Sequence, residues 1–504
     1  MATLDGSGRE VSLGMGITLR APGLRGQASA HDITPGSTTR APDVDGSSDA
    51  LAKALADEGF LRLRAIELAV AQVPSATTTG LRSPYSDQPG LEVNVPDLGK
   101  DVAQVLLAVD ENGVTTWNFP VDSGDKAAPT TRGSGGSIRF VVPAFATAPA
   151  GSSGTPPTRG VFGFLGKKVL ELIALPLGRL IVPPLAGAAA RAWETRSRPT
   201  RARLFDPENY LTADVPDLTE GDWQRLASGR SLWFVHGTFV TSHTAFAGLP
   251  RDVFARLYDR YEGRVAALDH HTLGYTPVEN VAILKESMPA GLELPVDLIS
   301  HSRGGLVARA LAGQAGTDTP FDVRRLIHVA TPNHGTALAT PDNLVAFLDR
   351  VTTMVNLIPD GLLDVVSTTL TGVLLAVKVI ATYGVTSSPG LGAMNGQGEF
   401  LANFNASPVD AEQYAIAADF TPSQGLLALT GKGLQNMMVD RVFQGASNDL
   451  VVPTAGVYEA DGDSDGLAIP PERRMVLPTT RAVYHGLFFS QPDVATAIEG
   501  WLSD

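Results

Sequence analysis

The chain has 504 residues, 43% hydrophobic and 18% charged, with a net charge of −14 and a mean hydropathy of +0.06. This composition predicts a globular protein of two or three domains, and the negative charge argues against a general nucleic-acid binder. The chain contains no cysteine, which excludes disulfides, cysteine-ligated zinc and a thiol nucleophile.

The N-terminal segment has no apolar run behind a basic start, so we expect no secretory signal. The sequence contains no uninterrupted stretch of 18 apolar residues, so we expect no transmembrane helix. Together with the lack of disulfides, these features favour a cytoplasmic protein, with peripheral contact to a membrane as an alternative. Residues 1–46 are rich in Gly, Ser, Thr and Pro, and we expect them to be mostly flexible.

Residues 47–148 are predicted to form a small β-rich domain. Residues 47–60 have the pattern of a short capped helix, and four strand-like runs follow. Asn112 and Gly113 predict a hairpin turn between the second and third of these runs. Because the segment contains no catalytic constellation, we expect a structural role or the binding of a protein partner.

Residues 149–203 are predicted to form a linker and an arm that is apolar with basic ends. Pro176, Glu171 and the pair Pro183-Pro184 interrupt its apolar run, which argues against a membrane span. A helix packed on the following domain and a hinge arm are two interpretations. A segment that docks on a membrane surface or on a partner is a third.

From residue 204 to residue 504, short apolar strands alternate with helical runs. This alternation predicts an α/β fold with a mainly parallel sheet. We expect strands within residues 231–237, 263–272, 296–302, 324–336, 412–419 and 473–478, and a closing helix at 492–502.

The sequence LISHSRGG (298–305) predicts a strand that runs through a tight turn into a helix, with Ser302 at the turn. A serine held there projects away from the sheet, and the helix N-terminus favours a developing negative charge. The residues two before and two after this serine must be small. Gly304 satisfies this requirement, and Ser300 replaces the usual first glycine.

An acid and a histidine follow Ser302 in the order that this architecture uses. Asp449 lies in a loop after the fifth predicted strand, and His485 lies after the last, so both fall at carboxyl ends of strands. The sequence therefore predicts Ser302, Asp449 and His485 as catalytic residues. Weaker alternatives are Asp419 and Asp440 as the acid, Ser300 as the nucleophile, and His328 and His334 as the base.

An oxyanion hole needs two backbone N–H donors. We expect one from Arg303, directly after the nucleophile, and one from Thr238, with Phe239 as the second choice. His236-Gly237 allows this loop a close approach, and His236 itself is expected to be structural.

The motifs LWFVHGTF, LISHSRGGLVAR, LIHVATPNHGT, SNDLVVP and VYHGLFF occur in the order seen in lipase-like α/β-hydrolases. This group includes bacterial triacylglycerol lipases and glycosylphosphatidylinositol-inositol deacylases, and the resemblance covers about residues 230–504. It implies the same roles for Ser302, Asp449, His485, Thr238 and Arg303. The stretch LDHHTLGYTPVENVAIL and the front domain also resemble a bacterial hydrolase group found near conflict or defence systems.

A long insertion at about residues 338–410 separates the fourth and fifth predicted strands. Residues 362–381 predict an apolar helix with one narrow polar stripe. The stripe consists of Asp364, Ser367, Thr368, Thr371 and Lys378. The helix is either part of the core or a lid over an acyl pocket, and the glycines within 389–406 offer hinges.

These features predict a serine ester hydrolase that cleaves apolar acyl esters, such as lipids, through an acyl-enzyme. We expect no metal and no other cofactor. One alternative is a hydrolase-fold scaffold with little or no activity that binds a protein partner. Another is an acyl hydrolase that acts on a peptide or a thioester, since one triad serves all acyl transfers.

Overall fold

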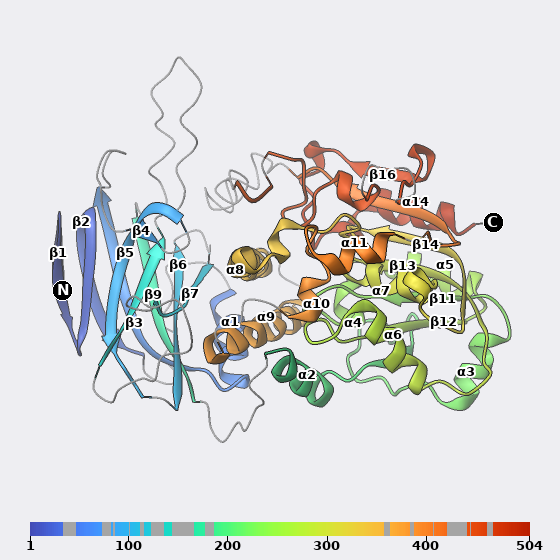
Figure 1. Ribbon diagram of the computed structural model, residues 1–504, viewed down its shortest axis with the longest axis horizontal. Helices are drawn as coiled ribbons and strands as arrows, with labels where there is room; N and C mark the ends of the chain where they lie inside the picture. The colour runs from blue at the N-terminus through green and yellow to red at the C-terminus, as the bar shows by residue number, and fades with distance from the viewer. Residues whose placement is uncertain are drawn as a thin grey trace, which may run out of the picture.

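The computed structural model describes residues 1–33, 47–72, 82–83, 86–99, 101–110, 115–121, 136–143, 166–176, 186–356, 363–383, 388–406, 408–420, 441–443, 445–460 and 467–503. Two sheets organise these residues, and a group of helices lies between them (Figure 1). The first sheet belongs to residues 2–176 and the second to residues 201–477.

The first sheet has nine strands, and all of its pairings are antiparallel. Its members are β1 (Ala2–Gly14), β2 (Ile17–Asp32), β3 (Leu61–Gln72), β4 (Arg82–Ser83), β5 (Ser86–Pro96), β6 (Val102–Asp110), β7 (Thr115–Asn118), β8 (Ser137–Pro143) and β9 (Gly166–Pro176). The main path runs β4-β5-β2-β3-β9-β6-β7, with β1 on β2 and β8 on β5. β6 and β7 pair as the predicted hairpin requires, while the turn at Asn112-Gly113 lies outside the described residues.

The prediction that residues 1–46 are flexible is wrong for Ala2–Asp32, which form β1 and β2. Alternate side chains of β2 are buried, including Ile17, Leu19 and Ala21. Such alternation places one face of a strand on a core. Because threonine, arginine and proline occupy the opposite face and glycines interrupt both strands, the composition of this segment concealed a strand pattern.

The predicted linker and arm at 149–203 is also wrong as a single unit. The segment contains β9, α2 (Ala186–Ser197) and the start of β10 (Arg201–Leu204). β9 lies between β3 and β6, so the β-rich part extends beyond residues 47–148. Leu170 and Leu172 enter one apolar core and Ile173 enters the other. A strand buried on both faces shows no period of two, which is why its apolar run suggested a helix.

The second sheet has the order β10-β12-β11-β13-β14-β15-β16. Its further strands are β11 (Ser231–Val235), β12 (Val265–Asp269), β13 (Leu294–His301), β14 (Phe321–Val329), β15 (Glu412–Ala418) and β16 (Arg474–Leu477). The pair β10–β12 is antiparallel and the others are parallel. The predicted α/β class, mainly parallel sheet and six strand positions are therefore confirmed here. β10 joins this sheet, so the predicted boundary at residue 204 falls within a strand.

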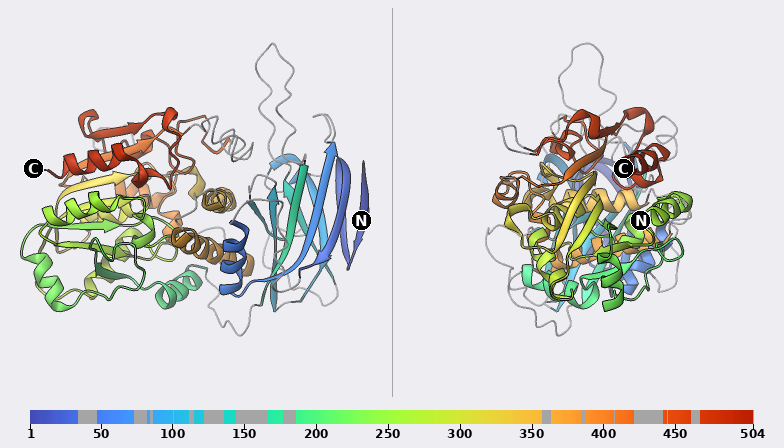
Figure 2. Two further views of the ribbon diagram at one scale, coloured as in Figure 1. Left: turned by 180° about the vertical axis from the view of Figure 1, so that it is seen from behind. Right: turned by 90° about the vertical axis from the view of Figure 1, so that its right-hand side faces the viewer.

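Helices cover both faces of the second sheet (Figure 2). They are α3 (Glu220–Ala227), α4 (Ser242–Ala245), α5 (Arg251–Arg260), α6 (Pro277–Glu286), α7 (Gly304–Leu311) and the closing α14 (Pro492–Trp501). Along β11, Leu232 and Phe234 pack with α5 and α14 on one face, while Trp233 and Val235 share the other core with α3, α6 and α7. This alternation is the period of two expected for a strand covered on both sides.

Four α-helices occupy the described part of the predicted insertion: α8 (Leu344–Asn356), α9 (Leu363–Tyr383), α10 (Pro389–Gly392) and α11 (Glu399–Asn405). Helices α8, α9 and α1 (Ser47–Asp57) lie between the two sheets, as Figure 1 and the left view of Figure 2 show. One apolar core contains Leu107 and Trp117 of the first sheet, Leu374 of α9 and Leu306 of α7. The two sheets are thus joined through the inserted helices. No helix within the described ranges is both long and apolar enough to cross a bilayer.

Removing residues 1–32 is expected to destabilise the first sheet, because β2 pairs with β1, β3 and β5. We expect the melting temperature to fall by on the order of 10 °C, since the apolar core that β2 forms with β3 and β5 loses part of its cover. Removing residues 1–15, which deletes β1 and spares β2, should have a smaller effect. Differential scanning calorimetry checks this, and unchanged melting of the longer deletion would contradict the role of β2.

Candidate active site

Ser302 lies between the end of β13 and the start of α7, with a φ of 53°. This left-handed conformation is strained for a residue other than glycine, and such strain persists only where the surroundings enforce it. The Ser302 N–H donates to Val329 O at 2.8 Å, and Gly305 N–H donates to Ser302 O at 2.9 Å. The turn is therefore fixed by the neighbouring strand β14 and by the first turn of the helix.

Glycine is required on the helical side of this turn. A Cβ at position 304 would lie 2.3 Å from the carbonyl oxygens of Val235 and His236, and one at position 305 would lie 2.1 Å from Thr331 Oγ1. On the strand side, Ser300 is buried and its hydroxyl donates to Ile327 O at 3.0 Å. A serine is accommodated there because its one polar atom has a partner.

The structure brings Ser302, His485 and Asp449 together. His485 Nε2 lies 2.8 Å from Ser302 Oγ, and His485 Nδ1 lies 2.8 Å from Asp449 Oδ2. The other carboxylate oxygen, Oδ1, accepts the N–H groups of Val451 and Val452 at 3.0 and 2.7 Å. All three side chains are buried. The carboxylate is therefore held by its own loop and presents its second oxygen to the imidazole.

The structure does not bring the weaker alternatives to Ser302. Ser300 bonds to β14, and His328 within β14 places Nε2 2.9 Å from Gln413 Oε1. His334 bonds through its backbone N–H to Gly456 O. Asp419 follows directly after β15, and no bond from its carboxylate to His485 occurs in the described part of the chain. Asp440 lies outside the described residues.

The backbone N–H groups of Thr238 and Arg303 lie beside Ser302 and have no acceptor among the described residues. A Cβ at Gly237 would lie 2.8 Å from Ser302 Cβ, so the loop after β11 passes directly over the serine. Arg198 Nη1 donates to Phe239 O at 3.0 Å, and Phe239 has a φ of 66°. The geometry therefore leaves Thr238 and Arg303 available as donors.

His236 sets the orientation of the Gly237–Thr238 peptide. Its Nε2 accepts the His270 N–H at 3.0 Å, so its Nδ1 carries the hydrogen and donates to Gly237 O at 2.8 Å. The peptide is trans, so its N–H, that of Thr238, points away from the His236 ring. His236 thus fits the structural role expected from the sequence.

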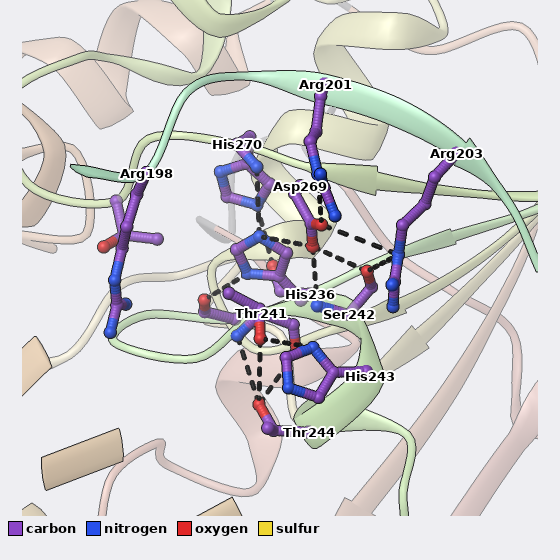
Figure 3. A network of polar contacts seen from close by, with 12 residues as sticks. Arg198, Arg201, Arg203, His236, Thr241, Ser242, His243, Thr244, Asp269 and His270 are labelled. Carbon is purple, nitrogen blue, oxygen red and sulfur yellow. Dashed lines mark hydrogen bonds and ion pairs between the residues drawn. The ribbon is translucent and has the colours of Figure 1, made fainter. Parts of the chain in front are cut away.

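A buried polar network stands behind this loop (Figure 3). The rings of His236 and His270 stack with their centroids 4.2 Å apart. Asp269 Oδ1 accepts the Ser242 N–H at 2.7 Å, while Asp269 Oδ2 lies 3.6 Å from Arg203 Nε. Burial acts to raise the pKa of Asp269, but His236, Arg203 and the bonds from Ser242 hold that pKa below its ordinary value. The network therefore keeps a charged carboxylate at the start of α4.

The side chain of Arg303 has a structural part that sequence reasoning missed, since only its backbone N–H was considered. The guanidinium is fully buried and donates to Gly390 O at 2.9 Å and to His271 O at 3.0 Å, with Nη1 also 3.2 Å from His270 Nδ1. It therefore ties the turn at Ser302 to the loop after β12 and to α10. An arginine directly after Ser302 and before two glycines was the available signal.

His301 is a second residue that sequence reasoning missed. Burial lowers its pKa to about 3, so the imidazole is neutral at physiological pH. Its Nε2 lies 3.0 Å from His485 O and donates to that carbonyl. His301 therefore holds the backbone of His485 beside Ser302.

A mainly apolar cavity with a volume of about 100 Å³ opens beside Ser302 and His485. It lies against the loop after β11, helices α8 and α9, and the segment around His485. Its apolar lining includes Phe239, Val240, Phe347, Val351, Met354, Val355 and Tyr484. Thr369 of α9 also lines it, whereas the side chains of Asp364, Ser367 and Thr368 lie outside the described residues.

Lowering the pH should destabilise the fold, because buried histidines bind protons less readily in the folded chain than in the unfolded chain. Burial lowers the pKa of His236 from 6.5 to about 4. The unfolded chain therefore binds more protons below pH 6.5, and the free energy of unfolding falls as pH falls toward 4. For His236 alone this loss is about 2 kcal/mol between pH 7 and pH 5. Urea unfolding at both pH values should show a smaller difference for His236→Asn than for the natural protein, and an equal difference would contradict this assignment.

Comparisons with solved structures give only distant similarities. Phospholipase PlaB from Legionella pneumophila is 15% identical over 45% of each chain, with a TM-score of 0.30. Lipase 1 from Pelosinus fermentans is 11% identical over 54% of this chain and 97% of its own, with a TM-score of 0.35. EstA from Clostridium botulinum is 13% identical over 60% of this chain and 98% of its own, at 0.33. TM-scores below 0.5 are too low to assign a fold or an activity.

The chain spans a little under half the length of the phospholipase it resembles. No curated protein matches it. Residues 197–503, more than half of the chain, match the model of a family described as a domain of unknown function, DUF7379. The chain belongs to the DUF7379 family.

Proposed function

We propose that the protein is a serine ester hydrolase of the α/β-hydrolase type that cleaves apolar acyl esters. The observation that carries this proposal is the continuous chain from Ser302 Oγ through His485 to Asp449, with 2.8 Å at each step. Two further features support the proposal: the strained turn at Ser302 and the strand order of the second sheet. Both are features of the α/β-hydrolase fold.

In this mechanism His485 Nε2 takes the proton of Ser302 as Oγ attacks the ester carbonyl. The N–H groups of Thr238 and Arg303 receive the negative charge that develops on the carbonyl oxygen. Asp449 orients His485 and stabilises its protonated form. His485 then returns the proton to the leaving alcohol, and water, activated by the same imidazole, releases the acid from Ser302.

The cavity supports an acyl group that is apolar and short. Its volume of about 100 Å³ is less than the ~150 Å³ cavity that holds benzene in a protein interior. A butyryl group has fewer heavy atoms than benzene and suits a smaller cavity, whereas a longer chain requires the walls to move. The proposed substrates are therefore esters with short apolar acyl groups, and lipids with long chains are the poorer substrates.

Replacing Ser302 with alanine is expected to abolish labelling by a fluorophosphonate probe and to lower the kcat for p-nitrophenyl butyrate by about 10⁴-fold or more. Ser300→Ala is the matched control, because it removes a hydroxyl two residues away that bonds only to β14. The control should keep labelling and most activity.

Equal labelling of the natural protein and Ser302→Ala would contradict the proposal. Turnover of thioester or amide analogues without ester turnover would favour the alternative acyl hydrolase. No turnover of any substrate and no labelling of the folded natural protein would favour the scaffold.

A further inference from the structure

Helix α8 has two faces with different neighbours. Phe347, Val351, Met354 and Val355 recur at spacings of four, three and one, and all line the cavity beside Ser302. Such spacings place these side chains on one stripe of a helix. One face of α8 is therefore a wall of the proposed acyl pocket.

The other face of α8 meets the edge of the first sheet. Thr115 N–H of β7 donates to Thr353 Oγ1 at 3.2 Å, and Trp117 N–H donates to Asp349 Oδ1 at 2.7 Å. The Trp117 indole N–H also donates to Thr352 Oγ1 at 3.1 Å. These are contacts between residues more than 230 positions apart in sequence. The helix thus stands between β7 and the cavity.

The spacing of these contacts matches on both elements. Among the described residues β7 is the last strand on its side of the sheet, so every second N–H has no strand partner there. Two residues along a strand span about 6.6 Å, and four along a helix span about 6 Å. Asp349 and Thr353 are four apart, and Thr115 and Trp117 are two apart. α8 therefore satisfies consecutive free donors of the edge strand.

Helix α9 is held from the same side. Lys378 Nζ donates to Glu58 O, just after α1, at 2.8 Å. A Cβ at Gly372 would lie 2.6 Å from Phe239 O, so α9 packs directly on the loop that carries Thr238. Lys378 belongs to the predicted polar stripe, and its partner is the first part of the chain rather than solvent.

We propose that the edge strand β7 fixes the position of α8 and thereby limits the length of the acyl group that the site accepts. This inference rests on the proposed function. Asp349 and Thr353 are positioning residues, because they act on the substrate only through the wall formed by the opposite face of α8. The first sheet is then a fixed part of the substrate site, and α8 is a wall rather than a freely opening lid.

The test compares Asp349→Ala with Asp349→Asn. Alanine leaves the Trp117 N–H without an acceptor, whereas asparagine keeps an oxygen in place. For p-nitrophenyl octanoate relative to butyrate, we expect the ratio of kcat/KM to rise about ten-fold in Asp349→Ala, the scale at which a hydrophobic pocket discriminates added methylenes. The rise should come mainly from a lower KM for octanoate. Asp349→Asn should keep the natural ratio.

Leu68→Ala is the matched control. It removes packing from the core on the other face of the first sheet, away from β7 and α8, and should leave the ratio unchanged. Thr353→Val is the second variant if Asp349→Ala does not fold, and it should raise the ratio in the same direction. An unchanged ratio in both variants, with the protein folded, would overturn the inference.

Hydrogen exchange of residues 344–356 gives a readout that does not depend on activity. Exchange should be faster in Asp349→Ala than in the natural protein and in Leu68→Ala. If the natural protein hydrolyses no ester and is not labelled by a fluorophosphonate, the proposed function is wrong. Hydrogen exchange would still report whether β7 holds α8. Unchanged exchange in α8 would show that β7 does not hold this helix.

Discussion

The close approach of α7 to the end of β11 is the constraint on which the site depends. The carbonyls of Val235 and His236 occupy the space that a side chain at Gly304 would need. This contact forces the strained turn at Ser302 and places the loop with Thr238 directly over it. The serine, two free N–H groups and a helix N-terminus therefore converge because strand and helix touch without a side chain between them.

Buried polar groups hold this convergence in place from behind. Arg303 reaches from the turn to the loop after β12, and His236 fixes the peptide whose N–H belongs to Thr238. His301 bonds to the backbone of His485. The side chains of Arg303 and His301 bond mainly to backbone carbonyls, so these contacts fix loops. Such supporting contacts would keep the proposed site within the small tolerances that acyl transfer requires.

Sequence patterns predicted the candidate catalytic residues. They did not predict residues whose role depends on contacts between distant segments of the chain. Ser302, Asp449 and His485 could be selected because the turn and the order along the chain are local patterns, and the strands around them followed from apolar runs. β9 was not recognised because burial on both faces removes periodicity. Asp349 could not be selected, since its partner on β7 is set only by the packing of two distant segments.

The first sheet determines how freely α8 and α9 can move beside Ser302. Without it, α8 and α9 would be an insertion free to move over Ser302. With β7 bonded to α8 and Glu58 bonded to Lys378, both helices are fixed between two sheets, which supports the proposal that the pocket takes short acyl groups. The DUF7379 match begins at residue 197, so this support comes from the part of the chain that precedes the matched segment.

The central claim is that Ser302 carries the acyl group during turnover. The most direct measurement is mass spectrometry of the protein quenched in acid during reaction with p-nitrophenyl butyrate, followed by peptide mapping. We predict one butyryl group on the peptide that contains Ser302 and none on Ser302→Ala. A hydrolysing protein with no acyl group on that peptide, or with the group on another residue, would contradict the account.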